Sequence, residues 1–131
     1  MKKYTTTLGE LWNTLRTLDT LNIINDVSCT VKGSYAIADN ITKIQNVLKT
    51  YDDKRTALIR KYSDGKDSIS PDDKNWDKFC TELNELNAIE AVVTDLRTIE
   101  LDDIVSGVTP AKIMAIKFMI EEPTESDKVE E

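Results

Sequence analysis

The sequence predicts a mainly helical α+β protein: a helical bundle with one long heptad-patterned helix in an antiparallel hairpin, plus a small two-stranded β element. Three observations support this class. Apolar residues recur at steps of three and four in three separate segments. One of these segments keeps a heptad spacing over nearly four heptads. Two other segments lack this helical phase and are rich in β-branched residues.

Length and composition predict one folded unit. The chain has 131 residues, of which 40% are hydrophobic and 31% are charged, as is typical of a soluble globular domain. We assign residues 1–120 to a single helical domain. Residues 121–131 contain six acids and one lysine, and we expect this acidic tail to be disordered because it has little apolar surface to bury.

The charge distribution argues against two classes of partner. The formal net charge is −7, whereas proteins that bind double-stranded nucleic acid usually carry a basic surplus. The longest apolar-rich stretch, IMAIKFMI at 113–120, is far too short to cross a membrane. No secretory apolar region follows the first lysines. We therefore expect a cytoplasmic protein that contacts neither double-stranded nucleic acid nor membrane.

The first predicted helix runs from Thr5 to Ile24. One of its opening threonines can cap it, and Glu10 is placed to complete a capping box with Thr7. Its apolar stripe consists of Leu8, Leu11, Trp12, Leu15, Leu18, Leu21, Ile23 and Ile24.

Two short strands are predicted. In the first, Val27, Cys29 and Val31 alternate with polar residues, which is the period of a half-buried strand. The second spans Glu90 to Leu96, with a continuation to Leu101 as the alternative end. We expect these two strands to pair with each other.

The clearest pattern is the heptad seam of the long helix. It consists of Ile37, Ile41, Ile44, Leu48, Tyr51, Arg55, Leu58 and Tyr62. The seam predicts one helix from Ser34 to Ser63, about 45 Å long. A seam of this length must be covered along one side. Packing within the chain is one explanation, and a homo-oligomer formed through the seam is the alternative.

The segment KYSDGKDSISPDDKNW at 61–76 has four aspartates within ten residues, which raises the question of a calcium loop. An EF-hand register with Ile69 at its eighth position places Tyr62 at the first and a lysine at the fifth, and neither side chain binds calcium. We therefore predict no metal site. Gly65 instead ends the long helix, and Ser70 with Pro71 begins the next one.

Two further helices complete the pattern. The helix after the loop carries an apolar stripe of Trp76, Phe79, Leu83 and Leu86. The last helix is capped by Thr109, has Pro110 at its first position and stops before Pro123. We expect it to be largely buried because it carries Ile113, Met114, Ile116, Phe118, Met119 and Ile120.

The residue types argue against an enzyme. The sequence contains no histidine, which removes the commonest general base. It has four glycines in total and no phosphate-binding glycine motif. Carboxylate pairs exist at 52–53, 72–73 and 102–103, but adjacent residues diverge on a helix. We predict a non-catalytic protein without a cofactor or a metal.

Arg55 is the residue that breaks the apolar seam. A seam arginine needs a carboxylate or water, and an ion pair with Glu82 or Glu85 on the facing helix is one explanation. The other is a binding site, because arginines beside tyrosines can hold a phosphate or a nucleotide base. The candidate ligand- or partner-binding residues are Tyr51, Arg55, Arg60 and Tyr62.

Three stretches carry a resemblance to known proteins. They are YAIADNITKIQNVLKTYDDKRTALIRKY, WDKFCTELNELNAIEAVVTDLRTIELDDI and TPAKIMAIKFMIEE. Over about residues 8–122 the chain resembles a group of small uncharacterised phage and prophage proteins of Gram-positive bacteria. The shared patterns are helical hairpins, so no functional residue carries over. The resemblance implies a phage product in the cytoplasm of the bacterial host.

Two functions fit these expectations. The first is a phage accessory protein that binds a host factor or its signal nucleotide and so counters host defence. The alternative is a virion or tail-assembly adaptor, for which self-association would be natural. In either case the partner is a host or phage protein, with a small nucleotide as a further ligand of the first.

Overall fold

The computed structural model describes residues 2–120 and confirms the predicted mainly helical α+β class. Its elements in chain order are β1 (Lys2–Thr7), α1 (Leu8–Thr20), α2 (Ile23–Asp26), β2 (Ser28–Cys29), α3 (Val31–Tyr62), α4 (Trp76–Asn87), β3 (Glu90–Leu96), the 3₁₀ turn η1 (Leu101–Asp103), β4 (Ile104–Ser106), α5 (Pro110–Ile116) and the 3₁₀ turn η2 (Lys117–Met119).

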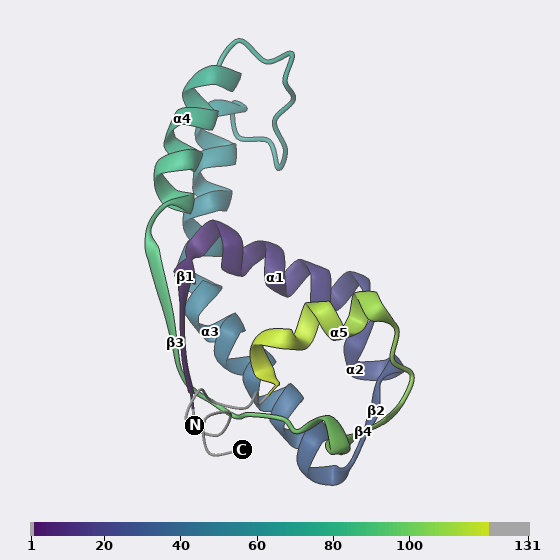
Figure 1. Cartoon of the computed structure of the whole chain (residues 1–131). Helices are drawn as coiled ribbons and strands as arrows, with labels where there is room; N and C mark the ends of the chain where they lie inside the picture. Colours follow the sequence, from purple (N-terminus) through teal and green to yellow (C-terminus); the bar gives the residue numbers. More distant parts are fainter. Residues whose placement is uncertain (1, 121–131) are drawn as a thin grey trace.

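Helix α3 is the axis of the molecule (Figure 1). Helix α4 folds back along its far half, and this α3–α4 hairpin projects beyond the rest of the protein. The near half of α3 packs against the body, which contains α1, α5 and the two small sheets. The predicted antiparallel hairpin is therefore present.

The ends of α3 follow from local chemistry. Thr30 begins the helix, because its hydroxyl oxygen accepts a hydrogen bond from the backbone N–H of Gly33 at 3.1 Å. The helix therefore starts three residues before the predicted Ser34 and includes Val31, which was expected in a strand. At the other end Asp64 and Gly65 have φ values of 58° and 85°, and this left-handed turn confirms the predicted role of Gly65.

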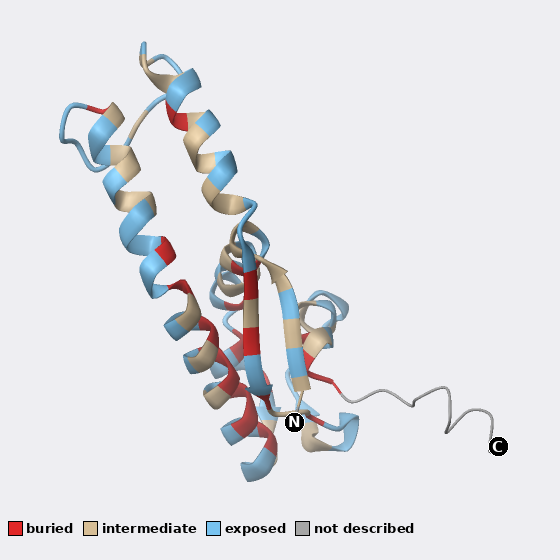
Figure 2. Cartoon of the chain, turned by 90° about the vertical axis from the view of Figure 1, so that its left-hand side faces the viewer, coloured by how far each residue is buried: buried red, intermediate tan, exposed pale blue. Residues whose placement is uncertain are grey.

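The heptad seam is covered within one chain. Its first five residues, from Ile37 to Tyr51, are buried, whereas Arg55, Leu58 and Tyr62 are half-buried. Figure 2 shows this change as the loss of red along α3 from the body towards the hairpin. Because α1, β3 and α4 pack on the seam, it needs no second copy to cover it, and the structure favours the explanation of packing within the chain.

The N-terminal threonines form a strand that the sequence analysis missed. Strand β1 pairs antiparallel with β3, with Thr7 opposite Glu90 and Lys2 opposite Leu96. Thr7 still caps α1 by accepting from the backbone N–H of Glu10 at 3.3 Å. The predicted helix from Thr5 is therefore shorter at both ends, since Asn22 with φ of 54° separates α1 from α2.

The expected pairing between the two predicted strands is wrong. The segment near Val27 forms only the two-residue strand β2, which pairs with β4 instead of β3. The reason is that β1 already occupies one edge of β3, while Thr30 turns the chain into α3. The turn after β4 requires glycine at position 107. Gly107 has a φ of 80°, and a Cβ at this position would lie 1.8 Å from the carbonyl oxygen of Asp26.

Helix α4 begins later than predicted. Ser70 does not cap a helix; its hydroxyl oxygen accepts from the backbone N–H of Asp72 at 3.3 Å, and its carbonyl accepts from that of Asp73 at 2.9 Å. These bonds close a turn at Ser70–Pro71, and the helix starts at Trp76. Ser70, which was predicted to cap a helix, therefore stabilises a turn.

The last helix agrees better with expectation. Thr109 accepts from the backbone N–H of Lys112 at 3.3 Å, and Pro110 is the first helical residue, as predicted. Ile116 is buried, but Met114 is 76% exposed, so the expectation of a largely buried helix is wrong for that face. Pro123 and the acidic tail at 121–131 lie outside the described residues.

The buried side chains form two clusters along α3. The first lies among α1, α2, the start of α3 and the α5–η2 segment, and the second lies among α1, the middle of α3 and β3. Leu15 of α1 and Phe118 of η2 pack against both clusters. The two clusters therefore form one continuous body.

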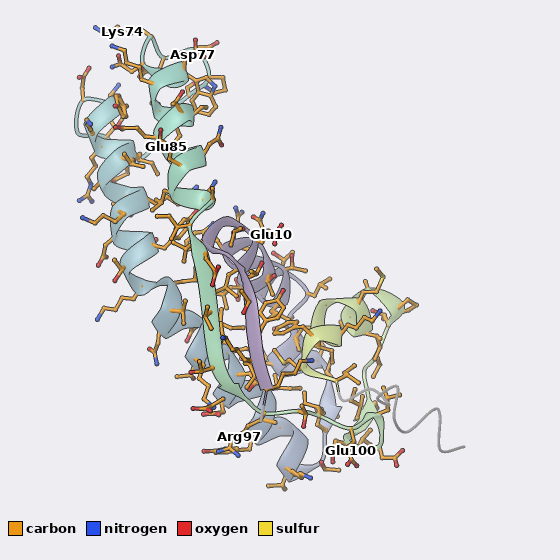
Figure 3. All side chains as sticks on the ribbon, turned by 60° about the vertical axis from the view of Figure 1, so that its left-hand side comes forward. Glu10, Lys74, Asp77, Glu85, Arg97 and Glu100 are labelled. Carbon is orange, nitrogen blue, oxygen red and sulfur yellow. The ribbon has the colours of Figure 1, made fainter. Side chains whose placement is uncertain are left out.

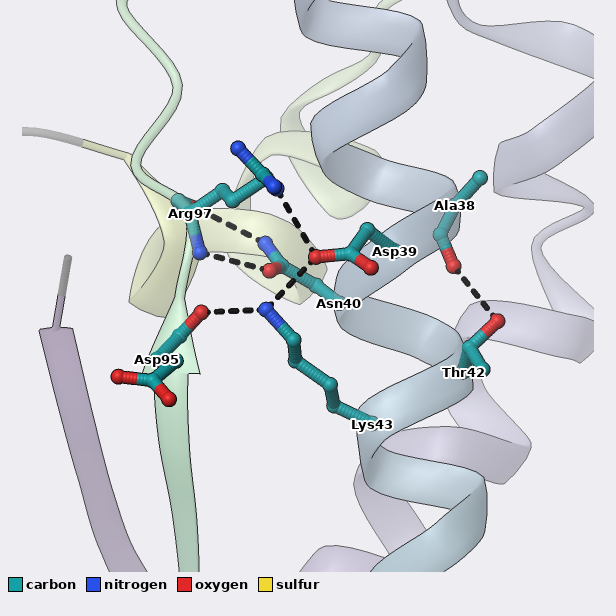
Figure 4. A network of polar contacts seen from close by, with 7 residues as sticks. All are labelled: Ala38, Asp39, Asn40, Thr42, Lys43, Asp95 and Arg97. Atoms are coloured by element: carbon teal, nitrogen blue, oxygen red, sulfur yellow. Dashed lines mark hydrogen bonds and ion pairs between the residues drawn. The ribbon is translucent and has the colours of Figure 1, made fainter.

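A polar network joins α3 to the end of β3 (Figure 4). Asn40, fully buried, donates from Nδ2 to the carbonyl of Arg97 and accepts from its backbone N–H, both at 2.8 Å. Arg97 Nε donates to Asp39 at 2.9 Å, and Lys43 Nζ lies 2.7 Å from the same carboxylate and 2.5 Å from the Asp95 carbonyl. The hydrogen bond from Lys43, helped by Arg97, holds the pKa of Asp39 below its usual value although partial burial opposes it.

The Asn40→Ala variant should be destabilised by about 2–4 kcal/mol, because it leaves a buried N–H and a buried carbonyl of Arg97 without partners. Chemical denaturation followed by circular dichroism measures this change. Asn46→Ala, at an exposed position on the same helix, is the matched control and should stay within about 0.5 kcal/mol of the parent. Equal stability of the two variants would contradict the role given to Asn40.

Candidate functional site

A cavity of about 340 Å³ lies where α1, α3 and α4 meet. We call it the Arg55 cavity. Figure 3 shows Glu10, one of its lining residues, at the start of α1 near the foot of α4. The cavity is lined by Thr7, Gly9, Glu10, Trp12, Asn13, Arg16, Tyr51, Arg55, Leu83 and Asn87.

Helical spacing places its main side chains. Tyr51 and Arg55 are successive seam positions of α3, so both face α1. Trp12 and Arg16 are likewise four residues apart on α1 and share one of its faces. The ring centroids of Trp12 and Tyr51 are 5.4 Å apart, which packs the two helices together beside the cavity.

Arg55 stacks on an aromatic ring instead of forming the predicted ion pair. Its guanidinium carbon lies 5.2 Å from the centroid of the Trp12 ring, a cation–π distance. Glu82 pairs with Lys61 at 3.4 Å, and within residues 2–120 no carboxylate forms an ion pair with Arg55. The expectation of Glu82 or Glu85 as its partner is therefore wrong, because the seam position turns Arg55 towards α1.

Trp12 also brings an unused hydrogen-bond donor. Its indole Nε1 is buried and has no acceptor among the described residues. A buried donor without a partner costs roughly 1–3 kcal/mol. Because this atom is shielded from solvent, the cost belongs to the packing of Trp12 and the atom is not a donor open to the cavity.

The charges of the Arg55 cavity are mainly positive. Arg16 and Arg55 supply two permanent cations. The one acidic side chain in the lining, Glu10, accepts a hydrogen bond from the hydroxyl of Thr6 at 2.6 Å. Two guanidinium groups beside a single carboxylate make the cavity suited to an anion.

Tyr51 closes the inner end of the site. Its hydroxyl donates to Asn87 Oδ1 at 2.5 Å, and the residue is buried. Burial raises the pKa of the Tyr51 phenol above its usual value, and the charge of Arg55 offsets part of this rise. Tyr51 therefore remains a neutral donor that holds α3 to the end of α4.

The structure brings together two of the four predicted site residues, Tyr51 and Arg55. Arg60 lies elsewhere, on the exposed hairpin end, where it pairs with Asp67 at 3.3 Å. Tyr62 lies beneath the ammonium group of Lys61, 5.0 Å from its ring centroid. Neither lines the Arg55 cavity, because they lie one to two helical turns further along α3 than Arg55.

Sequence reasoning missed three residues of the site: Trp12, Arg16 and Asn87. Trp12 was assigned to the apolar stripe of the first helix, which is correct for most of its ring. Arg16 follows it by one helical turn, and this arginine–tryptophan spacing was the available signal. Nothing in the sequence places Asn87 beside Tyr51, because their contact depends on how α4 folds back.

Comparisons with known proteins do not assign a function to this chain. No protein-family model matches the chain, and no curated protein or solved structure shows significant similarity to it. Among the described helices, none has the length and apolar character needed to cross a membrane. The function is therefore argued from the site itself.

The pKa of Tyr51 predicts a loss of stability in alkali. Because its pKa is raised in the folded state, the stabilisation it provides is complete below about pH 10 and is lost as the pH rises through the folded-state pKa. The free energy of unfolding, measured by denaturation at a series of alkaline pH values, should therefore fall less steeply in Tyr51→Phe than in the parent.

Tyr35→Phe is the control for this titration, since Tyr35 is exposed on the same helix. It should keep the alkaline slope of the parent. If both variants lost stability with the same pH dependence, Tyr51 would not be the group responsible.

Proposed function

We propose that the protein acts by binding and not by catalysis, and that the Arg55 cavity holds an anionic ligand of the nucleotide class. The observation that carries this proposal is the stacking of Arg55 on Trp12 without a carboxylate partner among the described residues. An arginine held rigidly by an aromatic ring and left without a counterion is pre-arranged for an external anion.

The chemistry of the lining supports this ligand class. Arg55 and Arg16 both line the cavity and can both donate to phosphate oxygens. At about 340 Å³ the cavity is at the small end of ligand pockets, which span roughly 300–1,000 Å³. It suits a single small nucleotide better than a polymer.

The biological role that we propose is sequestration. A phage-encoded accessory protein that holds a host signal nucleotide, or the host factor that responds to it, would counter a host defence without any reaction. The resemblance to phage and prophage proteins and a sequence without histidine support this role. The site of action would be the cytoplasm of the bacterial host.

A virion or tail-assembly adaptor is the second candidate function. The observation that favours it is the α3–α4 hairpin, which projects beyond the body (Figure 2). Projecting helical hairpins provide surfaces for assembly. Detection of the protein in purified phage particles would support this candidate, whereas its presence only in infected cells would favour sequestration.

Nucleotide binding can be tested by titration calorimetry with mononucleotides, cyclic mononucleotides and cyclic dinucleotides. For the nucleotide that binds the parent, Arg55→Ala should weaken binding about 10–100-fold, because a charge-assisted hydrogen bond is lost. Arg60→Ala is the matched control, since Arg60 does not line the cavity, and should bind like the parent. A parent that binds none of the three classes, or an Arg55→Ala variant with parental affinity, would overturn the proposal.

Trp12→Phe separates binding from folding. It keeps an aromatic ring beneath Arg55 but removes the indole N–H that has no acceptor. We expect nucleotide affinity to fall several-fold, because a phenylalanine ring holds the Arg55 guanidinium more weakly than the Trp12 ring does. Stability in denaturant should change little, since a buried unsatisfied donor is removed with it. A large loss of stability with unchanged affinity would show that Trp12 has a packing role only.

A further inference from the structure

A second pocket lies between α3 and α4 on the projecting hairpin and has a volume of about 670 Å³. We call it the hairpin groove. Its apolar lining includes Leu58, Leu86 and Ile89, and Ile89 is 52% exposed. The exposed side chain of Ile89 extends this apolar lining to the surface, where a partner can contact it.

On its α3 side the hairpin groove is lined mainly by a stripe that runs beside the heptad seam, together with the seam residues Tyr51 and Leu58. This stripe consists of Val47, Thr50, Lys54, Ala57 and Lys61, each one position before a seam residue. Adjacent helical positions diverge by about 100°, so the stripe points in a different direction from Arg55, and among the described residues Tyr51 is the one that lines both the groove and the Arg55 cavity. Covering the seam inside the chain therefore leaves this stripe available.

The two rims of the groove carry opposite charges. Lys54 and Lys61 line the α3 rim, and Glu82 and Glu85 line the α4 rim. Lys61 and Glu82 already pair across the groove at 3.4 Å. Lys54 and Glu85 form no ion pair within residues 2–120, so one free cation and one free anion remain on opposite rims.

We propose that the hairpin groove binds the same groove of a second copy of this chain. A two-fold rotation places the α3 rim of one copy over the α4 rim of the other. The basic rim then meets an acidic rim at both ends, and Lys54 faces Glu85 of the partner subunit. The two hairpins together make a four-helix bundle that covers Leu58, Leu86 and Ile89 in each copy.

The size of the hairpin sets the strength of this dimer. Helix α4 has 12 residues and is therefore about 18 Å long. Two such short helical faces bury less than the roughly 1,200–2,000 Å² of a standard stable interface. The dimer is therefore reversible and depends on protein concentration. It does not rest on the nucleotide proposal, since Arg55, Trp12 and Arg16 do not line this groove.

Sedimentation equilibrium of the whole chain tests the proposal with charge reversals. Lys54→Glu and Glu85→Lys should each weaken dimerisation about tenfold, because each turns two symmetric attractions into repulsions. An equimolar mixture of the two variants should regain the parental affinity as a heterodimer, since every rim contact is then between opposite charges. Lys49→Glu, at an exposed position of α3 outside the groove, is the control and should dimerise like the parent.

A second pair of variants tests the apolar contact. Ile89→Asp should abolish dimerisation, whereas Met114→Asp, on an exposed side chain of α5, should leave it unchanged. Circular dichroism verifies that both variants keep the parental helix content. A parent that stays monomeric over the whole concentration range, or a charge-reversed mixture that fails to regain affinity, would overturn the proposal.

Discussion

The pairing of Asn40 with the backbone of Arg97 is the contact on which the rest of the arrangement depends. Strand β3 ends at Leu96. The backbone N–H and carbonyl of the next residue, Arg97, therefore have no hydrogen-bond partners on a neighbouring strand within residues 2–120. The amide of Asn40 supplies both partners instead, accepting from the N–H and donating to the carbonyl of Arg97. A side chain can do this only if α3 lies at one height and one rotation relative to the sheet.

That fixed rotation determines what each side of α3 presents. The seam residues turn inward to α1 and β3, which brings Arg55 over the ring of Trp12. The next stripe, which contains Lys54, turns to the outside of the hairpin. Arg55 and Lys54 are adjacent on α3, so the same rotation that turns Arg55 to the cavity turns Lys54 to the groove. Asp39 and Lys43 lie beside Asn40 on α3. Nearer the solvent, the contacts of Asp39 with Arg97 and with Lys43 stabilise the same packing of α3 against the end of β3.

How much of the fold follows from the sequence differs from element to element. Helix α3 could be predicted because its signal is local and repeats over many turns, and Thr109–Pro110 and Gly65 act within a few residues of their position. Strand β1 could not, since a run of threonines suits a helix cap and a strand equally, and only the distant β3 decides between them. A similar ambiguity affects Ser70, because a serine hydroxyl can cap a helix or stabilise a turn. The start of α4 was therefore predicted at Ser70, where the hydroxyl stabilises a turn.

The candidate site divides in the same way. Arg55 could be found because it interrupts an apolar seam, which is a property of one helix. Arg60 and Tyr62 were grouped with it by closeness in sequence, but they lie one to two helical turns further along α3, outside the cavity lining. Trp12 and Arg16 belong to α1, and their place beside Arg55 depends on the crossing of two helices. No sequence period encodes that crossing, so tertiary packing alone assembles the site.

The pairing of β1 with β3 has a consequence for the order in which the molecule assembles. Thr7 lies opposite Glu90, which is 83 positions further along the chain, whereas the contacts of the α3–α4 hairpin close over a short loop. Closing a long stretch of chain carries a larger entropic cost, and contacts distant in sequence slow folding. We therefore expect the hairpin to form early. The N-terminal strand β1 should pair with β3 last, after the helices have packed together.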